Sequence, residues 1–304
     1  MSPRAWAAFA AMSALWGIPY LFIKIAVDDG VPPAFVAWSR VVLGALVLLP
    51  LAWRMRALHT VRGHWRWIVV YAVVEISLPF PLIAFGETRV SSSTTAIAIA
   101  TVPLIASLLA LRFAPGDRLS GRRLAGMLVG FAGVAALVGI DVSGSGSELL
   151  GIGAIVLAAV GYAFGPLVMS RGLSAPNAFA AIGSSLAVAA VVLAPLAAVD
   201  HPTAVPPAGA IASIVVLGLL CTAAAFVVFS VLIKAAGPTR STIVTYINPV
   251  IALGLGIAFL SEAPGAGAVA GLALILAGSW LSTDGRLPAR LERRLAGASA
   301  EAES

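Results

Sequence analysis

Ten stretches of mostly apolar residues, most of them about 20 residues long, follow one another along the 304-residue chain. A helix needs about 20 apolar residues to cross a bilayer, whereas barrel strands alternate over about ten residues. Helices are the remaining way to satisfy every backbone amide within lipid. The sequence therefore predicts an all-α polytopic membrane protein with ten transmembrane helices at 5–27, 34–53, 67–86, 94–113, 122–140, 149–170, 178–199, 209–233, 241–260 and 267–283.

The composition agrees with burial in lipid and excludes several classes of protein. Apolar residues make up 60% of the chain, charged residues make up 11%, and the mean hydropathy is +1.02. Soluble domains are about 45–50% apolar and about 25% charged, because polar surface must face water. A soluble enzyme, a disordered chain and a secreted disulfide scaffold are thus excluded. The single cysteine, Cys221, cannot form an internal disulfide.

The positions of the basic residues predict how the chain is oriented. Sixteen of the nineteen Lys and Arg residues fall on the side of the membrane that holds the N-terminus. The other side has Arg89 alone among basic residues, and its acidic residues are Asp28, Asp29, Asp141, Glu148, Asp200 and Glu262. Because positively charged loops stay in the cytoplasm, we expect both termini to be cytoplasmic and the chain to lie in the cell inner (plasma) membrane. The net charge of +6 then reflects topology and contact with anionic membrane lipids, and no nucleic-acid partner is expected.

The two halves of the chain are similar to each other. Residues 94–106 align with residues 240–252, and chance similarity between apolar helices is the alternative explanation. The matched positions are Pro103 with Pro249, Gly126 with Gly271, and Gly133 with Gly278. We predict two five-helix domains, residues 5–140 and 149–283, followed by a polar cytoplasmic tail, residues 284–304. An odd number of spans per half turns the second copy upside down, which gives a 5+5 inverted repeat typical of secondary transporters.

Several motifs occur in a characteristic order along the chain. They are Leu15 to Lys24 in the first span, Arg40 in the second, Phe85 to Ser93 followed by the Pro103 helix, and the Asn248-Pro249 helix with Glu262. In this order they resemble the drug/metabolite transporter superfamily, in its ten-helix EamA-domain type. The sequence departs from that pattern at Asp117, where a glutamate is frequent, and at Glu75 inside the third span.

This resemblance carries expectations about architecture and activity. It implies a 5+5 carrier that moves small organic solutes by alternating access, often outward. It also implies a central cavity lined by the first, third and fourth helices of each half. The solute itself is not specified, because the superfamily is broad.

Three charged residues are predicted to lie within spans, where an unpaired charge costs several kcal/mol. Lys24, near the outer end of its helix, could extend to the headgroups or face a solute cavity. Arg40 could hold an anionic group of the solute or form a structural pair with Asp28 or Asp29, and the pair is favoured. Glu75 could carry a coupling proton, because burial favours its neutral form, or it could make a hydrogen bond to a neighbouring helix.

Prolines and aromatic residues complete the predicted substrate-binding set. Pro19 and Pro166 lie in the first span of each half, and Pro103 and Pro249 lie in the fourth. We predict paired hinges there; ordinary kinks, which membrane helices tolerate, are the alternative. Asn248 could donate to a polar solute or satisfy the carbonyl that Pro249 leaves free. The predicted aromatic walls, whose members could equally serve packing, are Trp16, Tyr20, Tyr162, Phe226 and Tyr246.

The sequence carries no recognisable enzymatic or ATP-binding motif. It has no phosphate-binding loop, no nucleophile elbow and no His-Glu-x-x-His motif. His59 and His64 have no cysteine or carboxylate company of the kind that a metal site needs. We therefore expect no catalytic residues, no cofactor and no metal, and we expect an ion or solute gradient, with protons as one candidate, to drive transport.

These observations together predict a function. The chain is expected to be a secondary transporter of metabolites, amino acids or drugs, working as an exporter. A polytopic membrane enzyme acting on lipid-linked substrates is the alternative, and a non-transporting scaffold would not explain the repeat. Gly126 with Gly130, and Gly267 with Gly271, are typical of close helix packing, either within the fold or in a homodimer.

Overall fold

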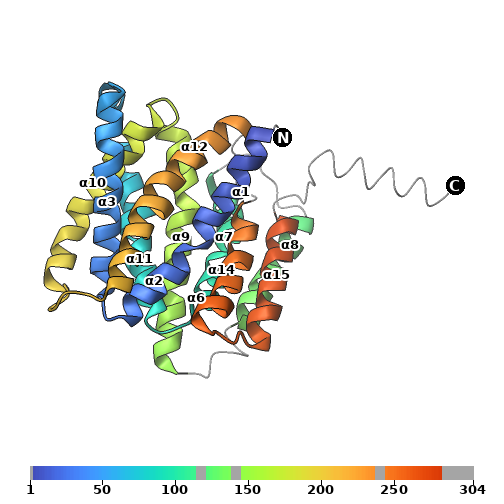
Figure 1. Cartoon of the computed structure of the whole chain (residues 1–304). Helices are drawn as coiled ribbons and strands as arrows, with labels where there is room; N and C mark the ends of the chain where they lie inside the picture. The colour runs from blue at the N-terminus through green and yellow to red at the C-terminus, as the bar shows by residue number, and fades with distance from the viewer. Residues whose placement is uncertain (1–2, 114–120, 138–144, 237–243, 283–304) are drawn as a thin grey trace.

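The computed structural model of the chain describes residues 3–113, 121–137, 145–236 and 244–282, and every regular element in these ranges is helical (Figure 1). The first half contains α1 (Pro3–Gly17), α2 (Pro19–Asp28), α3 (Pro33–Arg54), η1 (Leu58–Val61), α4 (Trp65–Tyr71), η2 (Ala72–Ser77), α5 (Pro79–Glu87), α6 (Ser92–Ile99), α7 (Val102–Phe113) and α8 (Gly121–Ala136). The second half contains α9 (Gly146–Gly172), α10 (Ala178–Val199), α11 (Ala208–Gly218), η4 (Leu219–Ala224), α12 (Ala225–Ala236), α14 (Val244–Leu260) and α15 (Ala266–Ser282). The predicted tail and Asp117 lie outside the described residues.

These helices form the apolar spans that the sequence predicts. Six rods are long and apolar enough to cross a membrane: Trp6–Asp28, Pro33–Arg54, Trp65–Glu87, Gly146–Met169, Ala178–Val199 and Ala208–Phe229. Shorter apolar helices cover Ser92–Ala106, Leu124–Ala136, Ile247–Leu260 and Ala266–Leu281. Large apolar side chains face outward, among them Leu46, Val191 and Phe259, which are 65%, 74% and 70% exposed. Such a surface suits lipid rather than water, and the predicted class of fold is confirmed.

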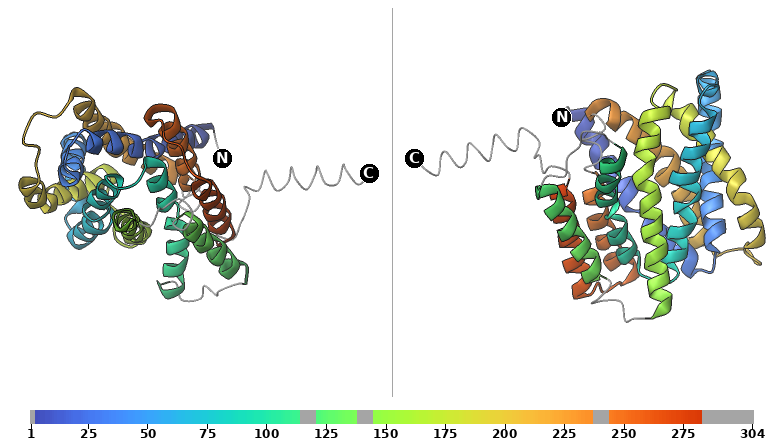
Figure 2. Two further views of the ribbon diagram at one scale, coloured as in Figure 1. Left: turned by 90° about the horizontal axis from the view of Figure 1, so that it is seen from below. Right: turned by 180° about the vertical axis from the view of Figure 1, so that it is seen from behind.

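The two halves point in opposite directions. In Figure 1, α1 begins at the upper end of the bundle, and α15 ends at that same end. The matching first helix of the second half, α9, begins at the lower end and runs upward (Figures 1 and 2). The fold is therefore a 5+5 inverted repeat.

Helices of one half pack mainly on helices of the other. The pairs α3 with α10 and α8 with α15 make the most extensive contacts, and each joins equivalent helices of the two halves. The α2–α11 contact in the first span has its counterpart in the α9–α5 contact. Exchanging the halves thus leaves the pattern of contacts unchanged, so the two repeats form one interlocked body.

Two π-helical turns occur at matching places in the two halves. The third span runs through α4, the turn η2 and α5, and the eighth runs through α11, the turn η4 and α12. A π-turn widens the helix by one residue and frequently lies at a functional site. The sequence analysis did not predict these turns, because apolar periodicity does not distinguish them from an α-helix.

The prolines interrupt the helices in the first half only. Pro19 begins α2 directly after the break between α1 and α2, and α7 begins just before Pro103. In contrast, α9 and α14 run without a break through positions 166 and 249. Pro166 and Pro249 therefore lie within continuous helices, because a packed membrane helix tolerates one missing hydrogen bond. Whether the four prolines act as hinges stays a prediction.

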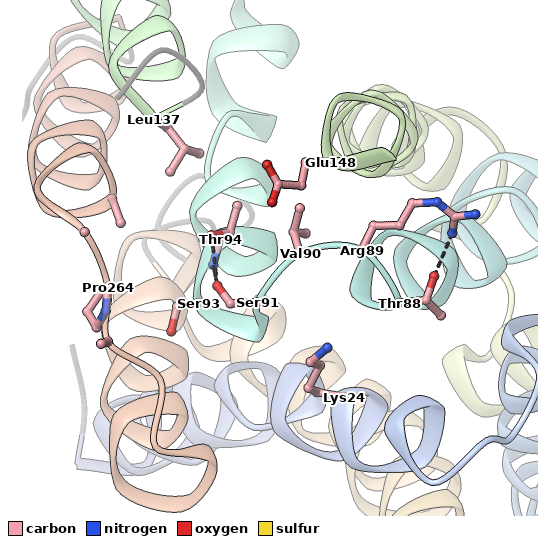
Figure 3. A pocket seen from close by; sticks show the side chains of 13 residues that line it. Lys24, Thr88, Arg89, Val90, Ser91, Ser93, Thr94, Leu137, Glu148 and Pro264 are labelled. Atoms are coloured by element: carbon pink, nitrogen blue, oxygen red, sulfur yellow. Dashed lines mark hydrogen bonds between the residues drawn. The ribbon is translucent and has the colours of Figure 1, made fainter. Parts of the chain in front are cut away.

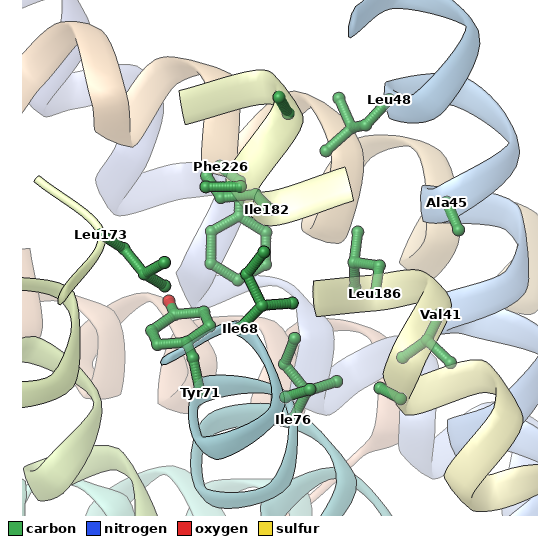
Figure 4. Close-up of a cluster of buried hydrophobic side chains, with 14 of the residues drawn as sticks. Val41, Ala45, Leu48, Ile68, Tyr71, Ile76, Leu173, Ile182, Leu186 and Phe226 are labelled. Atoms are coloured by element: carbon green, nitrogen blue, oxygen red, sulfur yellow. The ribbon is translucent and has the colours of Figure 1, made fainter. Parts of the chain in front are cut away.

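The largest buried apolar cluster joins α3, α4, η2 and α10 (Figure 4). Its fully buried members include Leu48, Ile68, Ile76 and Leu186. Phe226 of α12 and the ring of Tyr71 also belong to this cluster (Figure 4). This packing fixes α3 and both π-turns relative to one another.

Glycines bring α8 and α15 into close contact. A Cβ atom added to Gly133 would lie 2.8 Å from the Ile275 nitrogen and 2.9 Å from the Gly271 oxygen. A Cβ atom added to Gly278 would overlap the backbone of Gly130. The glycines that align between the two repeats therefore face one another, as close packing within the fold requires.

Candidate functional site

Four side chains follow one another at four-residue intervals along the first span. They are Trp16 in α1 and Tyr20, Lys24 and Asp28 in α2. Residues four apart lie on one face of a helix, so this face leads from the centre of the bundle to its outer end. The ring of Trp16 contacts Phe226, with 6.2 Å between centroids, and Phe229, at 4.7 Å. The structure thus brings Trp16 and Phe226 together, as the predicted aromatic walls require.

Arg40 lies buried in the centre of the bundle. Its Nε donates to Thr222 Oγ1 at 2.7 Å, and its guanidinium also contacts the Cys221 carbonyl oxygen at 3.4 Å. The guanidinium lies 4.0 Å from the centroid of Phe80. Both polar partners belong to the π-turn η4, where Thr222 in turn donates to the Leu217 carbonyl at 2.8 Å. Arg40 therefore links the second span to the eighth across the interface between the halves.

The expected pair between Arg40 and Asp28 or Asp29 is not found within the described residues. Asp28 instead accepts from Lys24 Nζ at 2.9 Å, one helical turn away on the same helix. Arg40 points toward η4 because the π-turn presents a carbonyl and a hydroxyl to it. Arg40 is therefore a buried guanidinium whose hydrogen-bond partners among the described residues are neutral. An anionic group of a solute would complete this arrangement.

Two tyrosines accompany Arg40. Tyr20 is a buried member of the cluster around α2 and α11, and Tyr162 packs against that same cluster. Tyr162 packs against two buried clusters, one around α3 and α10 and one around α2 and α11. Tyr20, Arg40 and Tyr162 come from three different spans, and their contact with a solute stays a prediction.

Lys24 caps a helix of the first half instead of extending to the headgroups. Its Nζ donates to the carbonyl oxygen of Glu87 at 2.8 Å. Glu87 is the last residue of α5, where the exposed carbonyls of the helix end attract a cation. Lys24 also lines a cavity at the outer end of the bundle.

Glu75 lies within the π-turn η2, beside α9. A Cβ atom at Gly165 would overlap its carboxyl group, so the glycine makes room for this side chain. Among the described residues, no hydrogen-bond partner reaches Glu75 Oε2. Among the described residues, Oε2 of Glu75 therefore does not accept the hydrogen bond from a neighbouring helix that the sequence left open.

Asn248 joins α14 to α1. With its amide nitrogen facing α1, it donates to the Val244 oxygen at 3.0 Å and to the Ser13 oxygen at 3.3 Å. These bonds make it a link between helices and do not satisfy the carbonyl that Pro249 leaves free. The side chains of Tyr246 and Pro166 lie outside the described residues.

A polar cavity of about 410 Å³ opens between the two halves, at the end of the bundle where α5 ends and α6 begins (Figure 3). It is lined by Lys24, Arg89, Ser91, Ser93, Thr94 and Glu148, together with Ala263 to Gly265. Figure 3 shows the amine of Lys24 and the carboxyl group of Glu148 on opposite sides of this space. The sequence analysis missed the cavity, although the hydroxyl run from Ser91 to Thr94 was a signal for it.

Glu262 of the second half accepts hydrogen bonds from the first half beside this cavity. Its carboxylate accepts from the Ser92 nitrogen at 2.7 Å, from the Ser93 nitrogen at 3.1 Å, and from the Ser93 hydroxyl. These donors lie at the N-terminus of α6, where a negative charge is favourable. Gly256 makes the approach possible, since a Cβ atom there would lie 2.5 Å from the Glu262 carboxylate.

Replacing Glu262 by alanine is expected to destabilise the protein by about 1–3 kcal/mol, because it leaves two backbone donors of α6 without an acceptor. Thermal unfolding in detergent measures this loss. Glu262→Gln keeps one acceptor oxygen and should lose less stability. An unfolding temperature that is the same for Glu262→Ala and the wild-type protein would show that the contact does not hold the halves together.

The fold and the buried Arg40 side chain define a multi-pass membrane protein of the inverted-repeat class. Aromatic side chains, among them Trp16 and Phe226, lie between its halves. The chain matches the EamA-like transporter family over residues 4–139 and again over residues 149–283. It belongs to this family. It is therefore a membrane transporter and not an enzyme.

Several curated proteins are similar to the chain. The uncharacterized inner membrane transporter YedA of Escherichia coli (strain K12) is 29% identical over 82% of this chain and 80% of its own length. A protein of Streptantibioticus cattleyicolor named "Probable terminal-alkyne amino-acid exporter" is 28% identical over 92% of this chain and 93% of its own. PagO of Salmonella typhimurium is 32% identical, and the match covers 42% of that protein. These relatives support a multi-pass inner membrane protein.

A solved structure shares the fold. A crystal structure described only as that of a protein superposes with a TM-score of 0.68. The match covers 93% of this chain and 98% of the other, at 20% sequence identity. The whole bundle, and not one half alone, is therefore common to both proteins.

Proposed function

We propose that the chain is a secondary exporter of small amphipathic solutes, amino acids above all, and that it works by alternating access. The observation that carries this proposal is the buried guanidinium of Arg40, held by Thr222 and Cys221 between the halves. A guanidinium binds carboxylates well, and the neighbouring rings of Trp16, Tyr20 and Tyr162 suit an apolar side chain. The name of the Streptantibioticus relative supports amino acids as cargo.

The inverted repeat supplies a mechanism for alternating access. Because the two halves have the same pattern of contacts, they can exchange conformations. One arrangement is then open to one side of the membrane, and the exchanged arrangement is open to the other side. Here the contact of Glu262 with α6 lies at the outer end and must break when the outer side opens fully. Arg40 and its aromatic neighbours would then face each compartment in turn.

The orientation follows from the charge distribution. The side with sixteen basic residues is proposed to be cytoplasmic, so both termini lie inside and the Lys24 cavity faces outward. Labelling of a cysteine placed at the C-terminus by an impermeant reagent added to intact cells would contradict this orientation. We also retain two predictions made from the sequence: that protons drive transport, and that two copies of the chain associate.

Reconstitution into liposomes tests the proposed function. Purified protein should accelerate the passage of labelled phenylalanine, leucine and propargylglycine, the last being a terminal-alkyne amino acid, relative to liposomes without protein. A gradient of pH or of a second solute should drive net movement. Equal leakage with and without protein for the whole panel, including cationic drugs, would contradict the proposal.

A further inference from the structure

Glu87 is a buried acid whose carboxyl group has no partner among the described residues. The side chain is fully buried, and neither of its two oxygens accepts a hydrogen bond there. Glu87 lies close to the outer cavity, because its carbonyl oxygen accepts a hydrogen bond at 2.8 Å from Lys24, which lines that cavity. The proposed transport mechanism assigns no role to Glu87.

The surroundings of Glu87 disfavour a negative charge. Burial without a hydrogen-bond donor is costly for a carboxylate. Glu87 is also the last residue of α5, and the C-terminus of a helix repels an anion. Asp28 of α2 and Glu262, which precedes α15, also oppose a negative charge there, whereas Lys24 and Arg40 favour one. Full burial with no hydrogen-bond donor among the described residues is the larger effect, so the neutral acid is favoured in this conformation.

Lys24 is placed to respond to the charge of Glu87. Its amine already touches the Glu87 main chain at 2.8 Å, while its ion pair with Asp28 is solvent-exposed on the aspartate side, at 54%. An exposed ion pair contributes little free energy. A carboxylate at Glu87 would therefore draw Lys24 away from Asp28, at the edge of the outer cavity that Lys24 lines.

We propose that Glu87 is the proton-binding group of this transporter, with Lys24 as its counter-ion when the proton leaves. The proton exchanges with water in the outer cavity: the neutral acid gives a carboxylate and a proton released to that water. The charged groups that face Glu87 are Lys24 and Asp28 on α2, Arg40 on α3 and Glu262 before α15; Tyr20 on α2 also lies close. This inference rests on the proposed function for its role in coupling.

Glu75, for which the sequence left open a coupling proton or a hydrogen bond to a neighbouring helix, differs from Glu87 in its surroundings. It lies in the π-turn η2 against Gly165 of α9. Among the residues that the structure describes, no ion pair or hydrogen bond joins a basic side chain to Glu75, whereas Lys24 already contacts the main chain of Glu87. A group that must be stable in both forms needs such a partner.

Infrared spectroscopy tests the protonation of Glu87 without any solute. At neutral pH the full-length wild-type protein in detergent should show the C=O stretch of a buried carboxylic acid, and Glu87→Gln should lack one component of that band. Glu75→Gln is the matched control and should retain the Glu87 component. A spectrum that is the same for wild type and Glu87→Gln would overturn the inference, because Glu87 would then be ionised. Should Glu87→Gln prove less stable by thermal unfolding, Glu87→Met provides the second comparison.

Transport in liposomes tests the coupling. Wild-type movement of labelled phenylalanine should respond to a pH gradient, Glu87→Gln should lose that response while still exchanging solute across equal pH, and Glu75→Gln should keep it. A pH response that survives in Glu87→Gln, or that is lost only in Glu75→Gln, would overturn the inference. A wild-type protein that moves no solute would instead contradict the proposed function, and the infrared result would still decide the protonation of Glu87.

Discussion

Replacing Arg40 by methionine is expected to abolish transport while leaving the protein folded. Each hydrogen bond from a charged donor to a solute carboxylate contributes about 1.5–3 kcal/mol, so solute binding should weaken roughly 10- to 150-fold. The loss of stability should be small, because the hydroxyl of Thr222 keeps its bond to Leu217. Replacing a buried charge by an apolar side chain of similar volume is often neutral or stabilising.

Solute binding and thermal unfolding, measured on the same preparation, separate the two effects. Arg66→Met is a suitable control, since Arg66 lies over Trp67 at the start of α4, 5.3 Å from the ring. Full transport by Arg40→Met would exclude a solute contact at Arg40. Misfolding of Arg40→Met would assign the residue a structural role in joining α3 to η4.

Replacing Gly278 by alanine is expected to cause the largest loss of stability among single glycine changes in α15. The added methyl group would overlap the Gly130 backbone and approach the Gly126 oxygen at 2.5 Å. Backbone atoms cannot turn aside as a side chain can, so α8 and α15 must move apart, at a cost of about 1–3 kcal/mol or more. Thermal unfolding in detergent and the yield of monodisperse protein measure this effect.

Gly254→Ala provides the matched control for this change. Gly254 also lies inside a helix, α14, but a Cβ atom there would meet nothing within 4 Å. Alanine stabilises an exposed helix position by up to about 1 kcal/mol relative to glycine. Equal unfolding temperatures for the Gly278 and Gly254 variants would show that α8 and α15 are not held together by close backbone contact.

The sequence predicted the bundle well because hydrophobic length and charge distribution are local properties. Each predicted span corresponds to an apolar helix or pair of helices, and the repeat seen in aligned prolines and glycines is present in the packing. Trp16, Tyr20, Lys24 and Arg40 were also singled out from residue type and depth alone. Trp16, Tyr20 and Lys24 share the first span, and Arg40 crosses from α3 to η4. Their role as solute contacts awaits the experiments above.

Partners that come from distant segments could not be predicted. Arg40 was expected to meet an aspartate nearby in sequence, but it binds Thr222, which lies 182 positions away. The carboxylate of Glu262 meets Ser92 across 170 positions. Glu87 was noted only within a motif, because nothing in its neighbours along the chain reveals that the side chain is buried without a donor. These features depend on the crossing of helices and on the π-turns, which leave no trace in the hydrophobic pattern.

The interlocking of the repeats has a consequence for biosynthesis. The most extensive partner of α8 is α15, the last described helix to be synthesised, and α3 must likewise await α10. The first five spans therefore enter the bilayer with their glycine-rich and polar faces uncovered, and lateral association can be completed only after translation of the second half. Nascent chains truncated between the halves should consequently be recognised by membrane quality control, and a gene split at that junction would need both polypeptides to be made together.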